Sequence, residues 1–521
     1  MAQGDDPNTF SEACSRQDAD KWLGAMKKEI NSFKENDVLE LSHLPPDRKA
    51  IGSKWVYKRK HDADGNLERY KARLVAQGYN QRYGIDYDET TSPVVRFESI
   101  RTLIALAVKH GLHLHQVDIS TAFLNGELKE EIYMNQPEGF EIKGKEHLVC
   151  KLKRSIYGLK QSPRCWNEAL DKHLKMMNFK QSPNDPCIYI LQSESETFII
   201  AVYVDDIIFG GRNQDLIKEL IKMIGNKFDI KDLGELNYFL GVKIVHFQSG
   251  AIWMGQSTYT REILSKFSME NSKPVATPVE SGCKLEKSKE TDVIIDQILY
   301  QSAVGQLLYL STRTRPDIAY AVGNVARFSA KPSQQHWTAV KRILRYLNGT
   351  IDYGLFYGNT SNIEGYSDAD WAGDLDDRKS TSGYVFMMSG AAISWNSKKQ
   401  TCVALSTAEA EYIALSKASQ ESIWLQRLLT DMGEKQANAT IIHEDNQSTI
   451  SMKKNPQFHG RAKHIDLKYH FVRELVKENE IELKYCQTEN MIADIMTKGI
   501  GKNQFEKLRK MIGLKNFDDC E

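Results

Sequence analysis

The acidic residues of one apolar hairpin are the first candidates for chemistry in this sequence. Residues 198–211 read FIIAVYVDDIIFGG, so seven apolar or aromatic residues precede Asp205 and Asp206, and a glycine pair closes the second run. This pattern is typical of two buried strands joined by a tight turn. Adjacent carboxylates beside apolar strands repel each other and resist desolvation, which favours a divalent cation as their partner. An exposed Asp-Asp turn is the competing interpretation.

A third carboxylate, Asp118, favours the metal interpretation. It ends the strand-like run LHLHQVDIS upstream of the hairpin. Three carboxylates at strand ends can hold two magnesium ions, which orient a primer hydroxyl and a nucleoside triphosphate for in-line displacement. The sequence therefore predicts a polymerase centre at Asp118, Asp205 and Asp206.

The words around these acids resemble one family closely. YVDD inside an apolar hairpin resembles the signature of reverse transcriptases, and several further words resemble the copia-type branch of long-terminal-repeat retrotransposon Pol polyproteins: WVYKRK, YKARLVAQGY, VDISTAFLNG, SIYGLKQSPRCW and LGELNYFLGVKI. The resemblance runs from Trp22 to Gly499 and keeps the family's order. It places the start of the chain after the family's protease and integrase, as expected of a processed product or a truncated copy.

The resemblance implies an enzyme that copies RNA and then DNA into DNA. Its expected cofactor is Mg²⁺, with Mn²⁺ as an alternative, at two ions per active site. Its expected partners are an RNA template, a DNA primer, the RNA–DNA hybrid and deoxynucleoside triphosphates, with the element's integrase and capsid as further candidates. The expected location is a cytoplasmic virus-like particle that delivers its product to the nucleus. Dimerisation is left open.

A basic hairpin precedes the first catalytic candidate. Residues 54–60 and 69–75 alternate like strands around the turn DADGN, and period two places Lys71 and Arg73 on one face. The resemblance implies that Lys71 or Arg73, with Arg73 preferred, contacts the incoming nucleotide. A basic hairpin that touches only template phosphates is the alternative.

Three more residues are candidates for substrate binding. Phe123, five residues after Asp118, occupies the family's steric-gate position, where a ring excludes a 2′-hydroxyl; a core phenylalanine is the alternative. Gly158 is expected to let the backbone approach the templating base pair, and Lys160 to meet phosphates. Tyr157 stands where retroviral enzymes usually carry Gln, so sugar or base contacts by that side chain are not expected to carry over.

A second set of acids lies in the last third of the chain. Asp368 and Asp445 end strand-like runs, Glu411 lies one turn into a predicted helix over 407–432, and Asp494 lies near a later helix start. Four separated acids of this kind suit a two-metal nuclease. Their order resembles ribonuclease H, and that resemblance implies the set Asp368, Glu411, Asp445 and Asp494.

Two of these four assignments have rivals. Glu409 competes with Glu411, which is preferred because the following YIAL resembles the family's helix. Positions 409 and 411 differ by about 200 degrees around a helix, so only one can face the site. Asp466 competes with Asp494, and His464 is a candidate assistant near the fourth acid or a structural histidine.

Composition sets the outer limits. The 521 residues carry 69 basic and 69 acidic side chains and are 41% hydrophobic, enough for several cores. Residues 48–75 hold nine Lys or Arg against three acids, and residues 148–180 hold eight against two, which predicts local tracks for a phosphate backbone.

The eight cysteines form neither a CxxC pair nor a zinc pattern, so reduced thiols are expected. No apolar run approaches membrane-spanning length, and no membrane partner is expected.

The predicted fold class is a multidomain α+β and α/β protein. Fingers, palm and thumb of a right-hand polymerase are followed by a ribonuclease H-like mixed sheet flanked by helices. The predicted divisions are a helical lead-in (1–48), fingers and palm (49–255), thumb or connection with a linker near 272–294 (256–358), the ribonuclease H domain (359–500) and a helical tail (501–521). A decayed or domesticated element product that only binds nucleic acid is the alternative, although no expected catalytic acid is missing.

Overall fold

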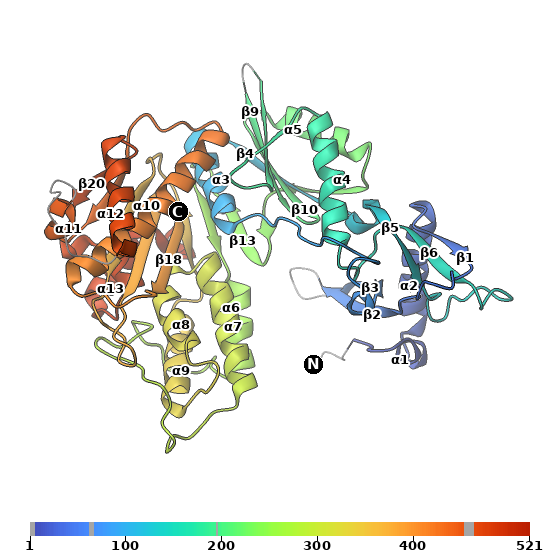
Figure 1. The fold of residues 1–521 in the computed structure, drawn as a ribbon, viewed down its shortest axis with the longest axis horizontal. Helices are drawn as coiled ribbons and strands as arrows, with labels where there is room; N and C mark the ends of the chain where they lie inside the picture. The colour runs from blue at the N-terminus through green and yellow to red at the C-terminus, as the bar shows by residue number, and fades with distance from the viewer. Residues whose placement is uncertain (1–5, 62–66, 194–195, 453–462, 521) are drawn as a thin grey trace.

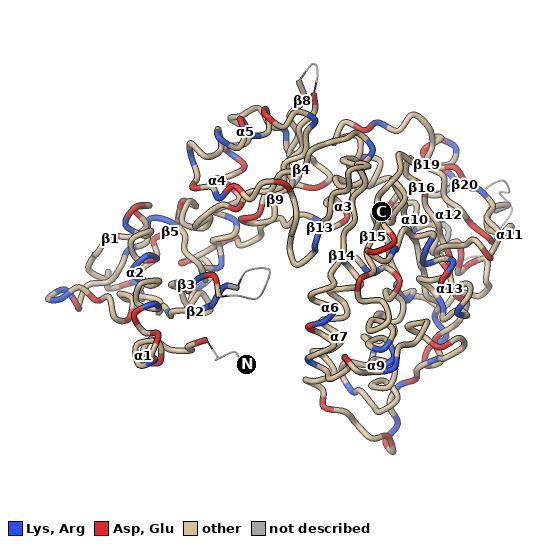
Figure 2. The backbone as a smooth tube through the Cα atoms, turned by 180° about the vertical axis from the view of Figure 1, so that it is seen from behind, with Lys and Arg blue, Asp and Glu red and all other residues tan. Residues whose placement is uncertain are grey.

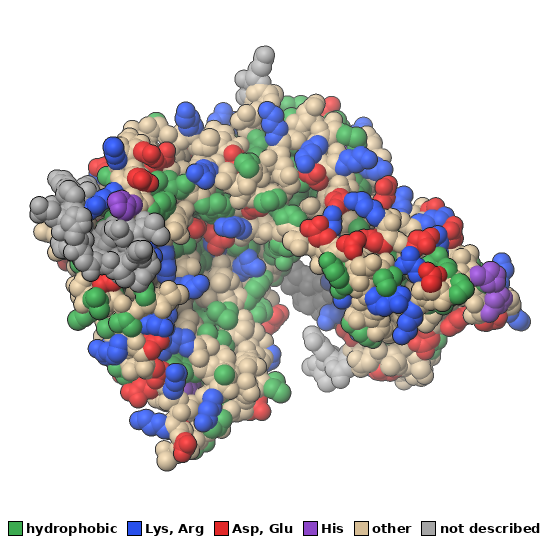
Figure 3. All heavy atoms as spheres, viewed as in Figure 1, with side chains coloured by type: hydrophobic (Ala, Val, Ile, Leu, Met, Phe, Trp, Pro, Cys, Tyr) green, Lys and Arg blue, Asp and Glu red, His purple; other side chains and the backbone are tan. Residues whose placement is uncertain are grey.

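The computed structural model describes residues 6–61, 67–193, 196–452 and 463–520. Figure 1 shows an N-terminal lobe on one side, a strand-rich middle, and a C-terminal lobe from which a bundle of helices hangs opposite the first lobe. The space-filling view is hollowed between the N-terminal lobe and that helix bundle (Figure 3). Basic and acidic residues are both spread along the described part of the backbone (Figure 2), in keeping with the net charge of zero.

The N-terminal lobe combines two helices with two small sheets. Trp22 of the second helix packs edge-on against Tyr57 and Tyr70 of the basic hairpin, so this helix lies on that hairpin. The elements are α1 (Phe10–Ser15), α2 (Ala19–Glu35), the β1-β6-β5 sheet of Leu39–Ser42, Val149–Arg154 and Glu127–Met134, and the hairpin of β2 (Ser53–His61) and β3 (Leu67–Ala76). Strand β1 lies in the segment 1–48, which the sequence predicts as a helical lead-in.

The palm is a six-stranded sheet in the order β11-β4-β10-β9-β8-β7. Its central strands are buried on both faces, as the continuous apolar runs predict. The strands are β4 (His113–Ile119), β7 (Lys180–Gln181), β8 (Ile188–Gln192), β9 (Thr197–Tyr203), β10 (Asp206–Gly211) and β11 (Ile230–Glu235), and the helices are α3 (Phe97–His110), α4 (Ser162–Met176) and α5 (Gln214–Gly225).

A helical bundle and a third sheet follow the palm. A hairpin turns near residues 248–250, and the helices that follow it are interrupted near Pro316 and Pro332. The elements are β12 (Tyr238–Phe239), β13 (Val242–His246), β14 (Ile252–Gly255), α6 (Ser257–Lys266), α7 (Gln297–Arg313), α8 (Ala319–Ala326), α9 (Gln334–Asn348) and β15 (Tyr353–Tyr357). Strand β15 pairs with β14 in this sheet.

The C-terminal lobe contains a mixed sheet in the order β18-β17-β16-β19-β20. Strands β16, β17 and β18 are antiparallel, and β19 and β20 run parallel to β16, the mixed arrangement expected of a ribonuclease H-like fold. The elements are β16 (Glu364–Ala369), β17 (Thr381–Met388), β18 (Ala391–Lys399), α10 (Thr407–Asp431), β19 (Thr440–Glu444), α11 (Gln447–Met452), α12 (Lys463–Lys477), β20 (Ile481–Tyr485), α13 (Lys502–Met511) and β21 (Leu514–Asn516).

The end of the chain returns to the third sheet. Strand β21 pairs with β15, so the segment predicted as a helical tail contains a strand as well as α13. A three-residue strand carries too little alternation to be recognised from sequence. Short 3₁₀ helices link several elements: η1 (Gly78–Asn80), η2 (Ala122–Asn125), η3 (Pro316–Ile318), η4 (Thr488–Asn490), η5 (Ile492–Met496) and η6 (Phe517–Asp519).

The palm and the C-terminal lobe are joined by a buried arginine. Arg101 of α3 donates to the carbonyl of Ile393 in β18 at 2.7 Å and to the carbonyls of Thr312 and Arg313 at the end of α7, each at 2.9 Å. Its guanidinium lies 3.8 Å from the ring centroid of Trp395. One side chain therefore connects the palm, the helical bundle and the last sheet.

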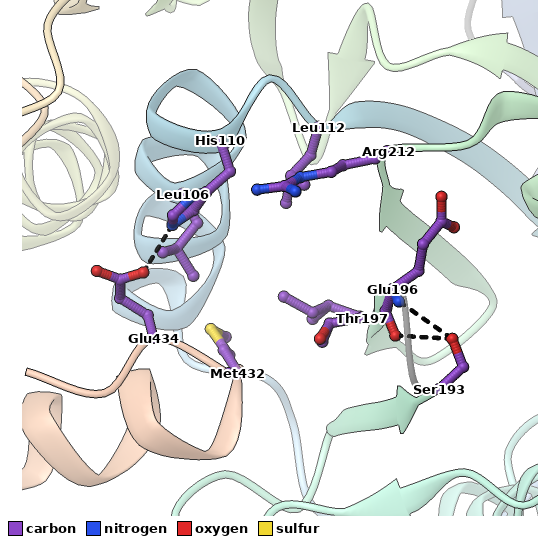
Figure 4. A pocket seen from close by; sticks show the side chains of 11 residues that line it. Leu106, His110, Leu112, Ser193, Glu196, Thr197, Arg212, Met432 and Glu434 are labelled. Carbon is purple, nitrogen blue, oxygen red and sulfur yellow. Dashed lines mark hydrogen bonds and ion pairs between the residues drawn. The ribbon is translucent and has the colours of Figure 1, made fainter.

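A cavity of about 270 Å³ lies at the same junction, beside the end of α10 (Figure 4). Glu434 closes one side by accepting from His110 at 2.6 Å, and Arg212 lines the opposite side. None of the predicted site residues lines this cavity.

Candidate active sites

The first carboxylate group lies where β4 meets the β9–β10 hairpin. Asp206, the first residue of β10, is the direct antiparallel partner of Asp118 in β4. Asp205 lies in the two-residue turn before it, where Val204 has a φ of +56°. The Asp205 carbonyl accepts from the amide of Ile119 at 2.8 Å. The hairpin predicted from the sequence is present, and it brings all three acids to one edge of the palm sheet.

These carboxylates lie in a field that favours a cation. Burial, with Asp205 and Asp118 adding to it, raises the pKa of Asp206 to about 6. Burial and then Asp205 raise the pKa of Asp118, while Lys71 acts in the opposite direction. Carboxylate oxygens are the ligands that Mg²⁺ and Mn²⁺ prefer, so the donor set fits the predicted ions.

The basic hairpin faces this centre. In the β2–β3 register Lys58 lies opposite Lys71 and Lys60 opposite Arg69, so the cations gather on one face. Burial lowers the pKa of the Lys71 ammonium, Arg73 lowers it further, and Asp118 raises it. The carboxylate of Asp118 is therefore within electrostatic reach of Lys71, as a nucleotide-binding role requires.

Arg73, Tyr157 and Phe123 form a stack beside the carboxylates. The Arg73 guanidinium lies 4.3 Å from the centroid of the Tyr157 ring, and that ring meets Phe123 edge-on at 4.7 Å. Phe123 is half-buried in η2, so it is neither a fully buried core residue nor a free surface ring. Burial raises the pKa of Tyr157 to about 12, which keeps its hydroxyl protonated at neutral pH. The sequence marked Tyr157 only as a departure from the retroviral pattern.

Gly158 is required for a reason that the sequence did not show. Its φ is +94°, and a Cβ there would lie 2.2 Å from the carbonyl oxygen of Ala76 in β3. The glycine therefore lets its own loop pack onto the basic hairpin. This contact positions Arg73 and Tyr157 relative to each other, and it does not depend on a bound template.

The cations that follow Gly158 already have protein partners. Lys160 donates to the hydroxyl of Tyr87 at 2.9 Å, and Arg164 pairs with Glu89 and Glu168, each at 2.8 Å. Lys151 and Lys153 pair with nearby acids too. The second basic stretch is therefore less available to phosphates than its composition predicts, although exposed pairs of this kind are weak enough to exchange.

The second carboxylate group lies on the C-terminal sheet. Asp368 of β16, Glu411 of α10 and Asp445, which follows β19, each offer an oxygen, and these oxygens all lie within 4.8 Å of one another. Among the described residues this is the one group of three that meets this distance; the palm acids are more widely spaced. Burial, then Asp368, Glu444 and Asp445, raise the pKa of Glu411.

The structure separates the two rival glutamates. Glu409 is the third residue of α10: its amide donates to the hydroxyl of the N-cap Ser406 at 3.2 Å, and its carboxylate accepts from the amide of Leu405 at 2.9 Å. Glu409 is thus a helix-capping residue. Glu411, two positions later, points to Asp368 and Asp445.

Asp494 reaches the second group through a lysine. It lies in η5, and Lys498 forms ion pairs with Asp494 at 2.8 Å and with Asp368 at 3.6 Å. Thr497 donates to Asp368 as well. Burial and Asp368 raise the pKa of Asp494 to about 7, against the opposing effect of Lys498. The side chains of Asp466 and His464 lie outside the described residues.

Lys498 and Glu444 are site residues that sequence reasoning missed. Glu444 is fully buried at the end of β19, and burial, Asp368 and Asp445 raise its pKa. Its position beside Asp445, and the spacing of four between Asp494 and Lys498, were the available signals.

Comparison with known proteins identifies the family. A profile described as reverse transcriptase (RNA-dependent DNA polymerase) matches residues 36–281. The retrovirus-related Pol polyprotein from transposon TNT 1-94 of Nicotiana tabacum is 44% identical over 98% of this chain. The putative transposon Ty5-1 protein of Saccharomyces cerevisiae is 33% identical, and this chain covers 100% of it. The chain belongs to the copia-type retrotransposon Pol family. It spans only 39% of the TNT 1-94 polyprotein and 35% of the Pol polyprotein from transposon RE2 of Arabidopsis thaliana.

The matched reverse transcriptase domain contains one of the two carboxylate groups of this Pol chain. Asp118, Asp205 and Asp206 lie inside the reverse transcriptase domain, and Asp368, Glu411, Asp445 and Asp494 lie beyond it. Among solved structures, a foamy viral protease-reverse transcriptase in complex with RNA/DNA hybrid is 14% identical with a TM-score of 0.47, covering 91% of this chain and 54% of that one. No helix among the described residues is long and apolar enough to cross a membrane.

Proposed function

We propose that this chain polymerises DNA on RNA and DNA templates at the Asp118 centre and cleaves the RNA strand of the resulting hybrid at the Asp368 centre. One observation carries the proposal. Two groups of partly buried carboxylates lie on two separate sheets, and the first lies inside the matched reverse transcriptase domain. Separate centres of this type can perform two phosphoryl-group reactions on one duplex.

At the first centre Asp118 and Asp205 would hold the ions, with Asp206 beside them. Bound Mg²⁺ or Mn²⁺ supplies Lewis-acid activation of the primer hydroxyl and charge neutralisation on the triphosphate. Lys71 and Arg73 bind the triphosphate from the hairpin, because their face is cationic and lies toward Asp118. Phe123 lies under the sugar and excludes a 2′-hydroxyl, and Tyr157 holds that ring in place.

At the second centre Asp368, Glu411 and Asp445 would hold a divalent ion. Their converging oxygens suit a hard cation, and the buried Glu411 Oε2 has no hydrogen-bond partner within the described part of the chain. Thr497 and Lys498 orient Asp368 from the other side. The substrate proposed here is the RNA strand of an RNA–DNA hybrid.

The test is one assay with two readouts. The purified chain is given a primed RNA template with separate labels on primer and RNA, Mg²⁺ and deoxynucleotides. Primer extension together with shortening of the RNA is the expected result. Primer extension without cleavage of RNA in any RNA–DNA hybrid would refute the proposed ribonuclease activity. Binding of nucleic acid without either reaction would favour the alternative of a protein that only binds nucleic acid.

A further inference from the structure

The two sides of Asp368 are occupied differently. On one side its carboxylate converges with Glu411 and Asp445. On the other side the ammonium of Lys498 lies 3.6 Å from Asp368 Oδ2 and 2.8 Å from Asp494 Oδ1. A protein cation thus bridges Asp368 and Asp494, the one described acid of the predicted four that lies outside the group of three oxygens.

The first side has the features of a cation site. Glu411 is only 7% exposed, its Oε2 has no hydrogen-bond partner among the described residues, and its carboxylate contributes an oxygen to the group of three. A buried carboxylate oxygen without a partner is costly unless a cation or a proton serves it. The Lys498 ammonium pairs with Asp368 and Asp494 and with no third acid of the described chain.

We propose that Lys498 takes the place of the second divalent ion at this centre, so that the free chain binds one divalent ion there instead of two. The inference rests on the proposed ribonuclease centre but concerns the number of ions bound and not the reaction. An ammonium can serve in this place because it brings one positive charge and three donors to two carboxylates without the dehydration that Mg²⁺ requires.

The Lys498 side chain can leave its position between Asp368 and Asp494. The Lys498 side chain is 38% exposed, whereas the side chains of Asp368 and Asp494 are each 2% exposed. A long, partly exposed lysine can swing out, and the two carboxylates remain. A divalent ion that arrives with a phosphate of the hybrid would then replace the Lys498 ammonium. Binding of the second ion would therefore depend on the substrate.

The test counts bound Mn²⁺ by electron paramagnetic resonance in the full chain without nucleic acid. The palm carboxylates are removed by D118N and D205N, so that only the second centre is counted. The parent is expected to bind one Mn²⁺ per chain, and K498M and K498Q to bind a second one. K498R, which keeps the charge, is expected to stay at one. K484M removes a lysine whose ion pair is with Glu482 and serves as the matched control.

The outcomes separate the proposal from the proposed function. Equal Mn²⁺ counts in the parent, K498M and K498Q would overturn the role of Lys498, as would two ions in the parent. Loss of the single ion in E411Q shows that the counted ion is at this centre, and its retention would overturn the site itself. If the counts change as expected but hybrid cleavage is absent, the ribonuclease assignment fails while the role of Lys498 as a cation stands.

Discussion

Asp206 lies directly opposite Asp118 in the antiparallel pairing of β10 with β4, with Asp205 in the adjoining turn. Partners in such a register present their side chains on one face of the sheet. The centre is therefore built from strand register, and any change in the length of the β9–β10 hairpin would separate the acids. Substitutions that keep side-chain volume test the carboxylates without disturbing this register.

Asp205→Asn is expected to abolish primer extension and to leave cleavage of a preformed hybrid intact, because the second carboxylate group lies on a different sheet. Asp118→Asn should behave in the same way. Asp206→Asn, if Asp206 only orients the other two, should reduce extension by about 10- to 100-fold. The assay is extension and cleavage measured side by side. Asp215→Asn, at a side chain that is 95% exposed on α5, is the control. Equal loss of both activities in folded Asp205→Asn would contradict separate centres.

Glu411→Gln is expected to eliminate hybrid cleavage, whereas Glu409→Gln should retain activity within about twofold. Glu411 is one of the three converging acids, and Glu409 caps α10 through Leu405 and Ser406. Glutamine preserves the capping acceptor, so the matched change at 409 costs little stability. Hybrid cleavage and thermal melting are measured for both variants. Cleavage that survives Glu411→Gln and is lost in Glu409→Gln would reverse the two assignments.

The predictable parts of this protein are those with strong local pattern. The apolar runs around Asp205 predict the hairpin, and the helical spacing around Trp22 predicts α2, because burial imposes periods of 2 and 3.6. The choice of Glu411 over Glu409 rested on the neighbouring word YIAL. The pattern Ser406-x-x-Glu409 is a helix N-terminus signature and favours a capping role for Glu409 on physical grounds.

Other features depend on contacts between distant segments. Lys498 resembles any surface lysine until β16 brings Asp368 beside it. The pairing of β21 with β15 joins segments about 160 residues apart and leaves no trace in local composition. The charge counts of the second basic stretch were misleading as well, because Arg164 pairs with Glu89 and Lys151 with Glu131, two acids outside that stretch.

Phe123→Val is expected to increase ribonucleotide incorporation relative to deoxynucleotides on the order of 10- to 100-fold, because it removes the ring that would meet a 2′-hydroxyl. The half-buried position of Phe123, edge-on to Tyr157, allows this change without opening a fully buried cavity. The ratio of ribo- to deoxynucleotide incorporation is measured on one primed template. Tyr157→Phe keeps the ring contact and is the control. An unchanged ratio in folded Phe123→Val would make Phe123 a packing residue.

Asp206→Asn is expected to alter the pH dependence of stability in the absence of metal. The pKa of Asp206 is about 6 in the folded chain, against an ordinary value of 3.8. Between these values the unfolded chain binds fewer protons than the folded one, so the wild type loses stability as pH rises from about 4 to about 6. The variant lacks this loss. Its melting temperature in EDTA should therefore rise relative to wild type across that window and keep the difference above it. A difference that does not change with pH would contradict a raised pKa, and added Mg²⁺ should reduce the difference by stabilising the wild type.

Arg101→Met is expected to loosen the palm from the C-terminal lobe. The substitution leaves the carbonyls of Ile393, Thr312 and Arg313 without their donor in a buried interface and removes the cation from the Trp395 ring. Each buried acceptor left unpaired costs about 1 to 3 kcal/mol, so the total should exceed about 3 kcal/mol. We expect calorimetry to resolve two unfolding transitions where the wild type shows more cooperative unfolding.

Arg212→Met, at an exposed arginine that lines the nearby cavity, should change stability by less than about 0.5 kcal/mol. Neither carboxylate group contacts Arg101, so each activity should persist below the first transition. Arg101→Met with the wild-type melting profile would show that the lobes are held together by other contacts, such as the pairs that Glu434 makes with Lys109 and His110.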